Sequence, residues 1–305
     1  MPILVRRSNL MVSLAAGSVG EAWRHNADAI TLDLDGAVAG SFVKDAIRTE
    51  GQGAAEIFVR VKSGDAEAGL EAAVWPGLRG IMLAGAESAE ETARASDIVT
   101  MLERARGIAN GSIQFIVMLE SARAVWDIRS IITASPRITQ AAIDECALAA
   151  DLGIADSLKL EVEYDPFVYA RGRLAFEATA AKVNPVGMAY PLSVQPREAP
   201  AAEIHTLATK ARNLGMKGVI CPHPSWVAPV NAAFTPTSEL VVYNKRVRDA
   251  FAAGVAAGTA AVPLDGRMID VPVDEWAIVV LATAEACAAR DAEKAAAISR
   301  LPVNS

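Results

Sequence analysis

Cysteine is scarce in this chain of 305 residues, and the three that occur, Cys146, Cys221 and Cys287, lie far apart. None of them forms a CxxC pair, so the spacing argues against a thiolate zinc site and against a disulfide framework. Unpaired thiols are typical of a reducing compartment. The cysteine pattern therefore predicts a cytoplasmic protein.

Long uninterrupted apolar runs are also missing. Residues 1–20 hold two arginines and an apolar stretch, but Asn9 and Ser13 interrupt it and no AxA cleavage pattern follows. The longest late run, residues 276–289, contains Glu285 and is shorter than a bilayer span. We therefore expect neither a secretory signal nor a membrane partner.

Charge of either sign is limited, and aromatic residues are few. Charged residues make up 21% of the chain, aromatic residues 5%, and the formal net charge is −7. A nucleic-acid partner is not expected, because binding to phosphates requires a basic surface. Apolar residues, at 52%, are plentiful enough to bury a large core.

The apolar residues are arranged in short runs that alternate with amphipathic stretches. Near-continuous apolar strands separated by helices indicate a parallel sheet covered by helices. About eight such units predict a (β/α)₈ TIM barrel, whereas an open doubly wound sheet lacks support because no GxGxxG follows the first strand. The expected strands are residues 9–14, 29–35, 55–61, 80–84, 113–119, 138–144, 186–192 and 217–222, and the expected helices are 41–51, 88–107, 122–135, 165–183 and 201–215.

The pattern changes after the eighth strand. Residues 238–258 and 273–300 are predicted to form long helices, and between them an alternating segment is centred on Asp265-Gly266, a type I′ hairpin signal. We therefore divide the chain into a barrel, residues 1–235, and a helix–hairpin–helix extension, residues 236–305. The extension is expected to pack on the barrel or on a neighbouring subunit.

Polar residues follow several of the expected strands, where a barrel carries its functional groups. Acids, an arginine and a histidine that share one mouth would suit a divalent ion and an anionic substrate. The candidates are Asp33, Asp35, Arg60, Lys62, Glu120, Asp144 and His223.

Each candidate also has a structural interpretation. Glu120 is placed where an acid favours the first turn of a helix, and Arg60 would fit a surface ion pair. His223, between two prolines, would fit a hydrogen-bonded loop histidine. Asp33 points either into the barrel or toward the helices, and in both cases a buried acid needs a partner.

Ten segments of the chain, in this order, carry a resemblance to one family. They are RRSNLMV, ITLDLDGAV with KDAIR, FVRV, GIMLAGAES, VMLESARAV, LAADLGI, YARGRL, LGMKGVICPHPSWV, VNAAFTPTSE and LDGRMIDVP. The chain resembles the citrate lyase beta-subunit-like branch of the HpcH/HpaI aldolase family, which includes malyl-CoA and citramalyl-CoA lyase relatives. The resemblance extends from Arg7 to about Cys287.

The resemblance implies a barrel enzyme, assembled as a homotrimer or homohexamer, that uses Mg²⁺. It implies a carbon–carbon lyase that joins or separates an acyl-CoA and a small 2-oxo acid. Arg60 corresponds to a catalytic and substrate-binding arginine, and Glu120 to a metal ligand in contact with the substrate. Asp270 corresponds to a catalytic aspartate that reaches a neighbour's active site.

Several positions depart from the family pattern, and all of them fall at the expected site. Ala147 occupies the position of the second metal-binding aspartate, and Asp144, at a position where a glycine is usual, is the candidate to replace it. Further departures are Gly36, Lys62, Ala84, Gly85 and Trp226. Two hypotheses follow: a Mg²⁺-assisted lyase with a modified site, or a catalytically degenerate paralogue or accessory subunit that binds an acyl-CoA or oxo acid.

Overall fold

The computed structural model describes residues 3–14, 22–34, 40–154, 166–187 and 198–300. Parallel strands form a sheet with the order β7-β6-β5-β4-β3-β2-β1-β8. The strands are β1 (Ser8–Ser13), β2 (Ala29–Asp33), β3 (Glu56–Lys62), β4 (Gly80–Ala84), β5 (Gln114–Leu119), β6 (Ile138–Ile143), β7 (Asn184–Val186) and β8 (Val219–Cys221).

The sheet closes between its two end strands, β7 and β8. Gly187, the residue after β7, pairs in parallel with Val219 of β8. Its amide donates to the carbonyl of Gly218 at 3.0 Å, and its own carbonyl accepts from the amide of Ile220 at 3.0 Å. The (β/α)₈ barrel predicted from the alternating pattern is therefore confirmed.

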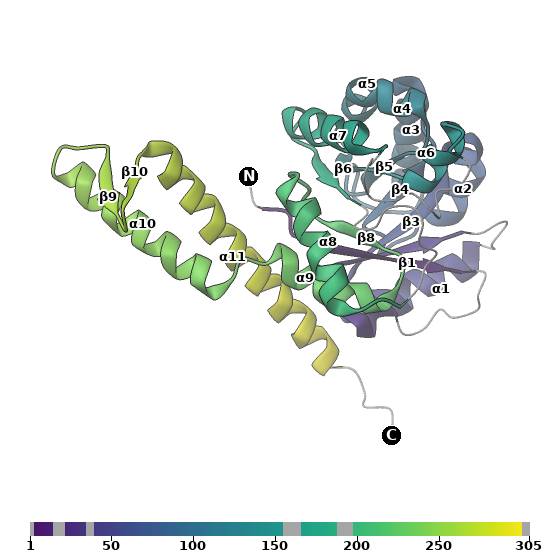
Figure 1. The fold of residues 1–305 in the computed structure, drawn as a ribbon. Coiled ribbons are helices and arrows are strands. Elements are labelled where there is room, and N and C mark those ends of the chain that lie inside the picture. Colours follow the sequence, from purple (N-terminus) through teal and green to yellow (C-terminus); the bar gives the residue numbers. More distant parts are fainter. Residues whose placement is uncertain (1–2, 15–21, 35–39, 155–165, 188–197, 301–305) are drawn as a thin grey trace. The chain divides into compact units, whose positions relative to one another are not determined.

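Helices surround the strands on the outside of the barrel (Figure 1). They are α1 (Gly40–Glu50), α2 (Ala66–Ala73), α3 (Ala89–Ala105), α4 (Ala122–Trp126), α5 (Ile128–Thr133), α6 (Glu145–Asp151), α7 (Val168–Ala180), α8 (Ala201–Asn213) and α9 (Val227–Phe234). In the described ranges, no helix has both the length and the apolar character that crossing a bilayer demands.

Some elements differ from the sequence predictions. The single helix expected over residues 122–135 is two helices, which meet at Asp127. Helices α2, α6 and α9 were not predicted. The seventh strand covers Asn184–Val186 and so begins earlier than the expected 186–192, of which residues 188–192 lie outside the described part of the chain.

Side chains of the strands divide between an outer and an inner core. Along β3, Ile57, Val59 and Val61 pack in the large core beneath the helices. Phe58 instead joins a smaller cluster inside the barrel, together with residues such as Met82 and Met118. Because successive side chains of a strand face opposite ways, every second residue beyond these also faces inward.

The N-terminal end of the barrel is closed by a buried arginine. The guanidinium of Arg6 hydrogen-bonds Gln114 at 2.5 Å and Gln140 at 3.1 Å, and it is ion-paired with Glu56. Its Cζ atom lies 4.8 Å from the centre of the Phe58 ring. The contacts of Arg6 fill the interior at the N-terminal end of the barrel. In TIM barrels the functional groups lie at the other end, where the strands end.

The chain divides into two compact units, one of residues 6–234 and 297–305, which contains the barrel, and one of residues 1–5 and 235–296. The second unit contains α10 (Ser238–Ala256), a hairpin of β9 (Val262–Leu264) and β10 (Arg267–Ile269), and α11 (Val271–Ser299). Asp265 and Gly266 have φ of 49° and 74°, as a type I′ turn requires. Val247, Ile269 and Ala277 form its small buried core.

Candidate functional site

Arg60 lies between two acids at the C-terminal ends of the strands. Its Nη2 donates to Oε1 of Glu120 at 2.7 Å, and its Nη1 lies 3.3 Å from Oδ2 of Asp33. The three side chains are between 16% and 22% exposed. Asp33 therefore points into the barrel, and the acids that Arg60 contacts are in the mouth rather than on the outer surface.

Strand register explains why these three groups meet. Asp33 on β2 is paired directly with Arg60 on β3. Arg60 is two residues beyond the inward-facing Phe58, and Glu120 is two residues beyond the inward-facing Met118. Parallel strands end at the same edge, so the three inward rows end together.

The charge of Arg60 is maintained by its neighbours. Burial favours the neutral guanidine, but the carboxylates of Asp33, Glu120 and Asp144 outweigh it and raise the pKa of Arg60 above its ordinary value. The same interaction places Asp144 within electrostatic reach of the cluster. Three carboxylates and one guanidinium leave this group with two formal negative charges, a suitable balance for a divalent cation.

Asp144 follows β6 and begins α6. It continues the inward row of Gln140 and Ala142, and its Oδ1 accepts from the amides of Cys146 and Ala147, both at 3.0 Å. Such a side chain satisfies amides that have no partner within the helix. Ala147 is consequently in the first turn of α6, and the carboxylate that faces the mouth is that of Asp144.

Two further acids hold α6 in position. Glu145 accepts from Nη2 of Arg171 on α7 at 2.5 Å, within a two-contact ion pair. Asp151, at the other end of α6, accepts from the amide of Ala122 at 2.8 Å. The second bond ties α6 to the segment that follows Glu120. The sequence showed only that these acids follow a predicted strand, and it did not predict their partners.

A glycine adjoins the second oxygen of Glu120. A Cβ atom added to Gly85 would lie 3.2 Å from Oε2 of Glu120, and the φ of Gly85 is +72°, which disfavours any other residue. The carbonyl of Gly85 accepts from Oγ of Ser63 at 2.7 Å. The ends of β3 and β4 are therefore joined beside Glu120, with no side chain from position 85.

The remaining candidates are not all brought to this cluster. Nδ1 of His223 accepts from the amide of Ser225 at 3.2 Å and lies 2.9 Å from its Oγ, so the ring begins a short 3₁₀ turn, Pro224–Trp226. This is the structural role that was left open for His223. Trp226 is fully buried in the outer core. Asp35 lies outside the described residues.

Asp270 belongs to the C-terminal unit, whereas Arg60 and Glu120 belong to the barrel unit. Its Oδ1 accepts from the amide of Val273 at 3.2 Å at the start of α11. The predicted catalytic role of Asp270 thus stays a prediction. The other predicted site residues, Arg60, Glu120 and Asp144, lie in one mouth.

Glu120 and Asp144 are the carboxylates of the mouth that could hold a magnesium ion together with a ligand. Among the described residues, no three His, Cys, Asp or Glu side chains form a group that would hold a metal. Mg²⁺, however, is commonly held by one or two carboxylates and completed by water and substrate oxygens. Within the described ranges, Oε2 of Glu120 and Oδ2 of Asp144 accept no hydrogen bond.

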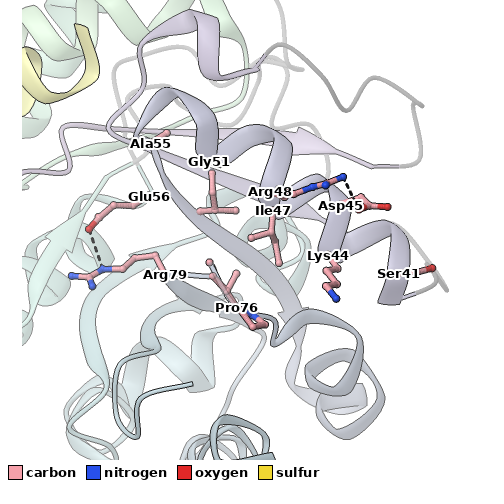
Figure 2. Close-up of a pocket in the computed structure, with 13 residues that line it drawn as sticks. Ser41, Lys44, Asp45, Ile47, Arg48, Gly51, Ala55, Glu56, Pro76 and Arg79 are labelled. Atoms are coloured by element: carbon pink, nitrogen blue, oxygen red, sulfur yellow. Dashed lines mark hydrogen bonds and ion pairs between the residues drawn. The ribbon is translucent and has the colours of Figure 1, made fainter. Parts of the chain in front are cut away.

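A separate cavity lies at the opposite end of the barrel. It has a volume of about 930 Å³ and is lined by α1, by the start of β3 and by residues 76–79, which precede β4. Figure 2 shows two ion pairs among its charged residues: Arg79 lies 3.0 Å from Glu56, and Arg48 lies 3.1 Å from Asp45. The remaining cation, Lys44, lies 5.3 Å from the centre of the Trp75 ring. Catalytic groups of TIM barrels come from the other end, so this cavity is not the candidate active site.

Residues 10–224, which include almost the whole barrel, match the HpcH/HpaI aldolase/citrate lyase family. The chain belongs to this family. The resemblance inferred from the ten sequence segments is therefore confirmed.

Relatives of this HpcH/HpaI family member match over most of its length. It is 27% identical to the citrate lyase subunit beta of Haemophilus influenzae, covering 92% of this chain and 97% of that protein. It is 28% identical to the corresponding subunit of Escherichia coli, over 94% and 95%. The L-malyl-CoA/beta-methylmalyl-CoA lyase of Cereibacter sphaeroides is 24% identical, over 85% and 88%.

Solved structures share the fold of this family member. A citrate lyase from Burkholderia xenovorans superposes with a TM-score of 0.75 at 17% identity, covering 94% of each chain. The protein CitE from Mycobacterium tuberculosis, in complex with magnesium, acetoacetate and coenzyme A, gives 0.67 at 22% identity, covering 92% of this chain and 98% of that one. At these identities the similarity supports the architecture.

Proposed function

We propose that this protein is a Mg²⁺-assisted carbon–carbon lyase, which cleaves or forms the bond between an acyl-CoA and a small 2-oxo acid. The observation that carries the proposal is the position of Arg60 between Asp33 and Glu120, with Asp144 within electrostatic reach. Relatives named citrate lyase and malyl-CoA lyase, and a related structure that contains magnesium and coenzyme A, support the same reaction class.

The chemistry requires stabilisation of the negative charge that develops on thioester and oxo-acid oxygens. Glu120 and Asp144 are the residues that would hold Mg²⁺, and the ion would supply Lewis-acid polarisation of the oxo acid. Arg60 remains protonated and donates hydrogen bonds to an oxygen on which negative charge develops. Asp33 orients the guanidinium from the side opposite Glu120.

Proton transfer at the thioester carbon requires another group. We assign it to Asp270, delivered by the C-terminal unit of a neighbouring copy in a homotrimer or homohexamer. In the cleavage direction the substrate hydroxyl releases its proton to water and becomes the carbonyl of the oxo acid as the carbon–carbon bond breaks. The electron pair of that bond forms the thioester enolate, which takes a proton from Asp270. Exposed apolar residues on α11, Trp276, Ile278 and Val279, support a contact of this unit with another surface.

The direct test is turnover of malyl-CoA and citramalyl-CoA by the purified protein, with and without Mg²⁺. The proposal expects release of an acyl-CoA and an oxo acid that depends on Mg²⁺ and falls at least about a hundredfold in Glu120→Gln. Binding of CoA esters and oxo acids without turnover would instead establish the alternative, a catalytically degenerate paralogue. Glu90→Gln, at an exposed acid on α3, is the matched control.

A further inference from the structure

Lys62 is a second cation at the mouth of the barrel. It is the last residue of β3 and lies two residues beyond Arg60, so the two side chains belong to the same inward-facing row. Arg60 is mostly buried between acids, whereas Lys62 is exposed at the rim. An ammonium at this position is accessible to a ligand that enters the mouth.

The two cations differ in their partners. Arg60 is engaged by Glu120 at 2.7 Å and by Asp33 at 3.3 Å, so much of its charge is already balanced. The ammonium of Lys62 makes no hydrogen bond or ion pair with a residue in the described part of the chain. Lys62 is therefore a cation at this rim, among the described residues, whose counter-charge is left for a ligand.

The neighbouring strand leaves room beside Lys62. Lys62 is paired in register with Ala84, the last residue of β4, and Gly85 follows with no side chain. The Cβ direction of Gly85 points to Oε2 of Glu120, which would lie 3.2 Å away. Between Lys62 and Glu120, the end of β4 and the residue after it therefore contribute only the methyl group of Ala84 and the hydrogen atom of Gly85.

We infer that Lys62 binds the carboxylate of the 2-oxo acid, an inference that rests on the proposed function. The cluster has a formal charge of −2, from the carboxylates of Asp33, Glu120 and Asp144 and the guanidinium of Arg60. A bound divalent cation neutralises this charge, and the carboxylate of the oxo acid then adds one negative charge. The ammonium of Lys62 balances that charge. A compact, flexible point charge suits a carboxylate that shifts as the bond forms or breaks.

The position of Lys62 also defines the substrate group that it selects. Because the side chain lies on the rim, it meets the acid end of the oxo acid while Arg60 and Glu120 face the carbonyl end. An oxo compound of the same shape without a carboxylate should therefore gain nothing from Lys62. This difference makes the inference measurable separately from catalysis.

The experiment is calorimetric titration of pyruvate and of methyl pyruvate into the protein with saturating Mg²⁺. Three variants are compared: Lys62→Met removes the charge, Lys62→Arg keeps it, and Lys217→Met removes an exposed charge that precedes β8 at the other end of the barrel. Wild type should prefer pyruvate to methyl pyruvate. Lys62→Met should weaken pyruvate binding about tenfold, because the carboxylate loses its contact with the ammonium. The affinity for methyl pyruvate should not change, because the uncharged ester does not make that contact.

The remaining outcomes are distinct. Lys62→Arg should retain pyruvate affinity within about threefold, since a charged hydrogen bond is preserved, and Lys217→Met should resemble wild type. Equal pyruvate affinity in wild type and Lys62→Met overturns the role of Lys62 and leaves the proposed function standing. If a parallel titration shows that Lys62→Met weakens the binding of coenzyme A but not of pyruvate, Lys62 contacts the phosphates of coenzyme A and the inference is overturned as well. No pyruvate binding in wild type contradicts the proposed function itself.

Discussion

At the scale of single residues, the mouth of the barrel depends on balanced burial of charge. Arg60 loses hydration on burial, but Asp33, Glu120 and Asp144 raise the pKa of its guanidinium above the ordinary value. It therefore stays charged through the whole pH range in which the fold persists. Any pH dependence of ligand binding near neutrality must come from another group.

Asp144 combines two tasks that substitution can separate. One oxygen caps α6 at 3.0 Å from two amides, and the other is available to a cation. Asp144→Asn retains a capping oxygen but loses the charge, so Mg²⁺ affinity should fall while stability changes by only a few tenths of a kcal/mol. Asp144→Ala should lose both, with a cost of about 1 kcal/mol to folding.

Denaturant unfolding and Mg²⁺ titration of the two Asp144 variants measure these effects. Thr237→Ala serves as a control for the loss of a cap alone. Oγ1 of Thr237 accepts from the amide of Leu240 at 3.2 Å and caps α10, which belongs to the C-terminal unit. If Asp144→Asn binds Mg²⁺ as wild type does, Asp144 is a structural cap and not a ligand.

At the scale of elements, sequence patterns predict strands better than the short helices of the mouth. The strands are recognisable because each is an apolar run with both faces buried. Helix α6 has only seven residues, too few for a clear period, and its start is set by the Asp144 cap. The cap shows that Asp144 precedes the helix and that Ala147 lies in its first turn, and the assignment of Asp144 as a replacement metal ligand stays a prediction.

Strand register supplies what the sequence left open at the site. Alternation alone placed Asp33 on one of two faces, and only its pairing with Arg60 shows that the face is the inner one. The contact between Arg60 and Glu120 joins residues 60 positions apart. Such contacts follow from the closure of the barrel, which no local pattern contains.

A buried ion pair joins helix α3 to the segment before β6. Glu103 accepts from Nη2 of Arg137 at 2.7 Å and from the amides of Gly111 and Ile113 at 2.8 and 2.9 Å. Burial opposes ionisation, but these donors outweigh it and lower the pKa of Glu103. Its contribution to stability is therefore complete above the ordinary glutamate pKa and is lost as the pH falls through the lowered folded-state value.

We expect Glu103→Gln to reduce the free energy of unfolding by about 3 kcal/mol at neutral pH, because Arg137 would keep a buried charge without a counter-charge. The difference from wild type should shrink as the pH is lowered below about 4. Denaturant titrations over a pH series measure it, with the exposed Glu90→Gln on the same helix as control. A pH-independent difference would contradict the lowered pKa.

At the scale of the whole molecule, the residues assigned to the proposed reaction come from two compact units of the chain. Arg60 and Glu120 belong to one and Asp270 to the other. If Asp270 acts in a neighbouring copy, Glu120→Gln and Asp270→Asn are each inactive alone but complement each other in mixed assemblies. Some interfaces then join an intact Glu120 to an intact Asp270.

For random mixing in equal amounts, about a quarter of the sites in a cyclic assembly combine the two intact residues, by the symmetry of the interface. The expected activity after co-refolding is therefore about a quarter of wild type. Mixing wild type with Glu120→Gln gives the reference for dilution. Activity no higher than that of the separate variants would show that Asp270 does not act across the interface.

The central claim is that the group around Arg60 binds an oxo acid together with a divalent cation. A calorimetric titration of Mg²⁺ into the protein in the presence of pyruvate tests this claim most directly. We predict saturable binding that requires pyruvate and is lost in Glu120→Gln, since the ion would be held by Glu120, Asp144 and the oxo acid together. Binding that is equally strong in Glu120→Gln, or no binding at millimolar Mg²⁺, would contradict it.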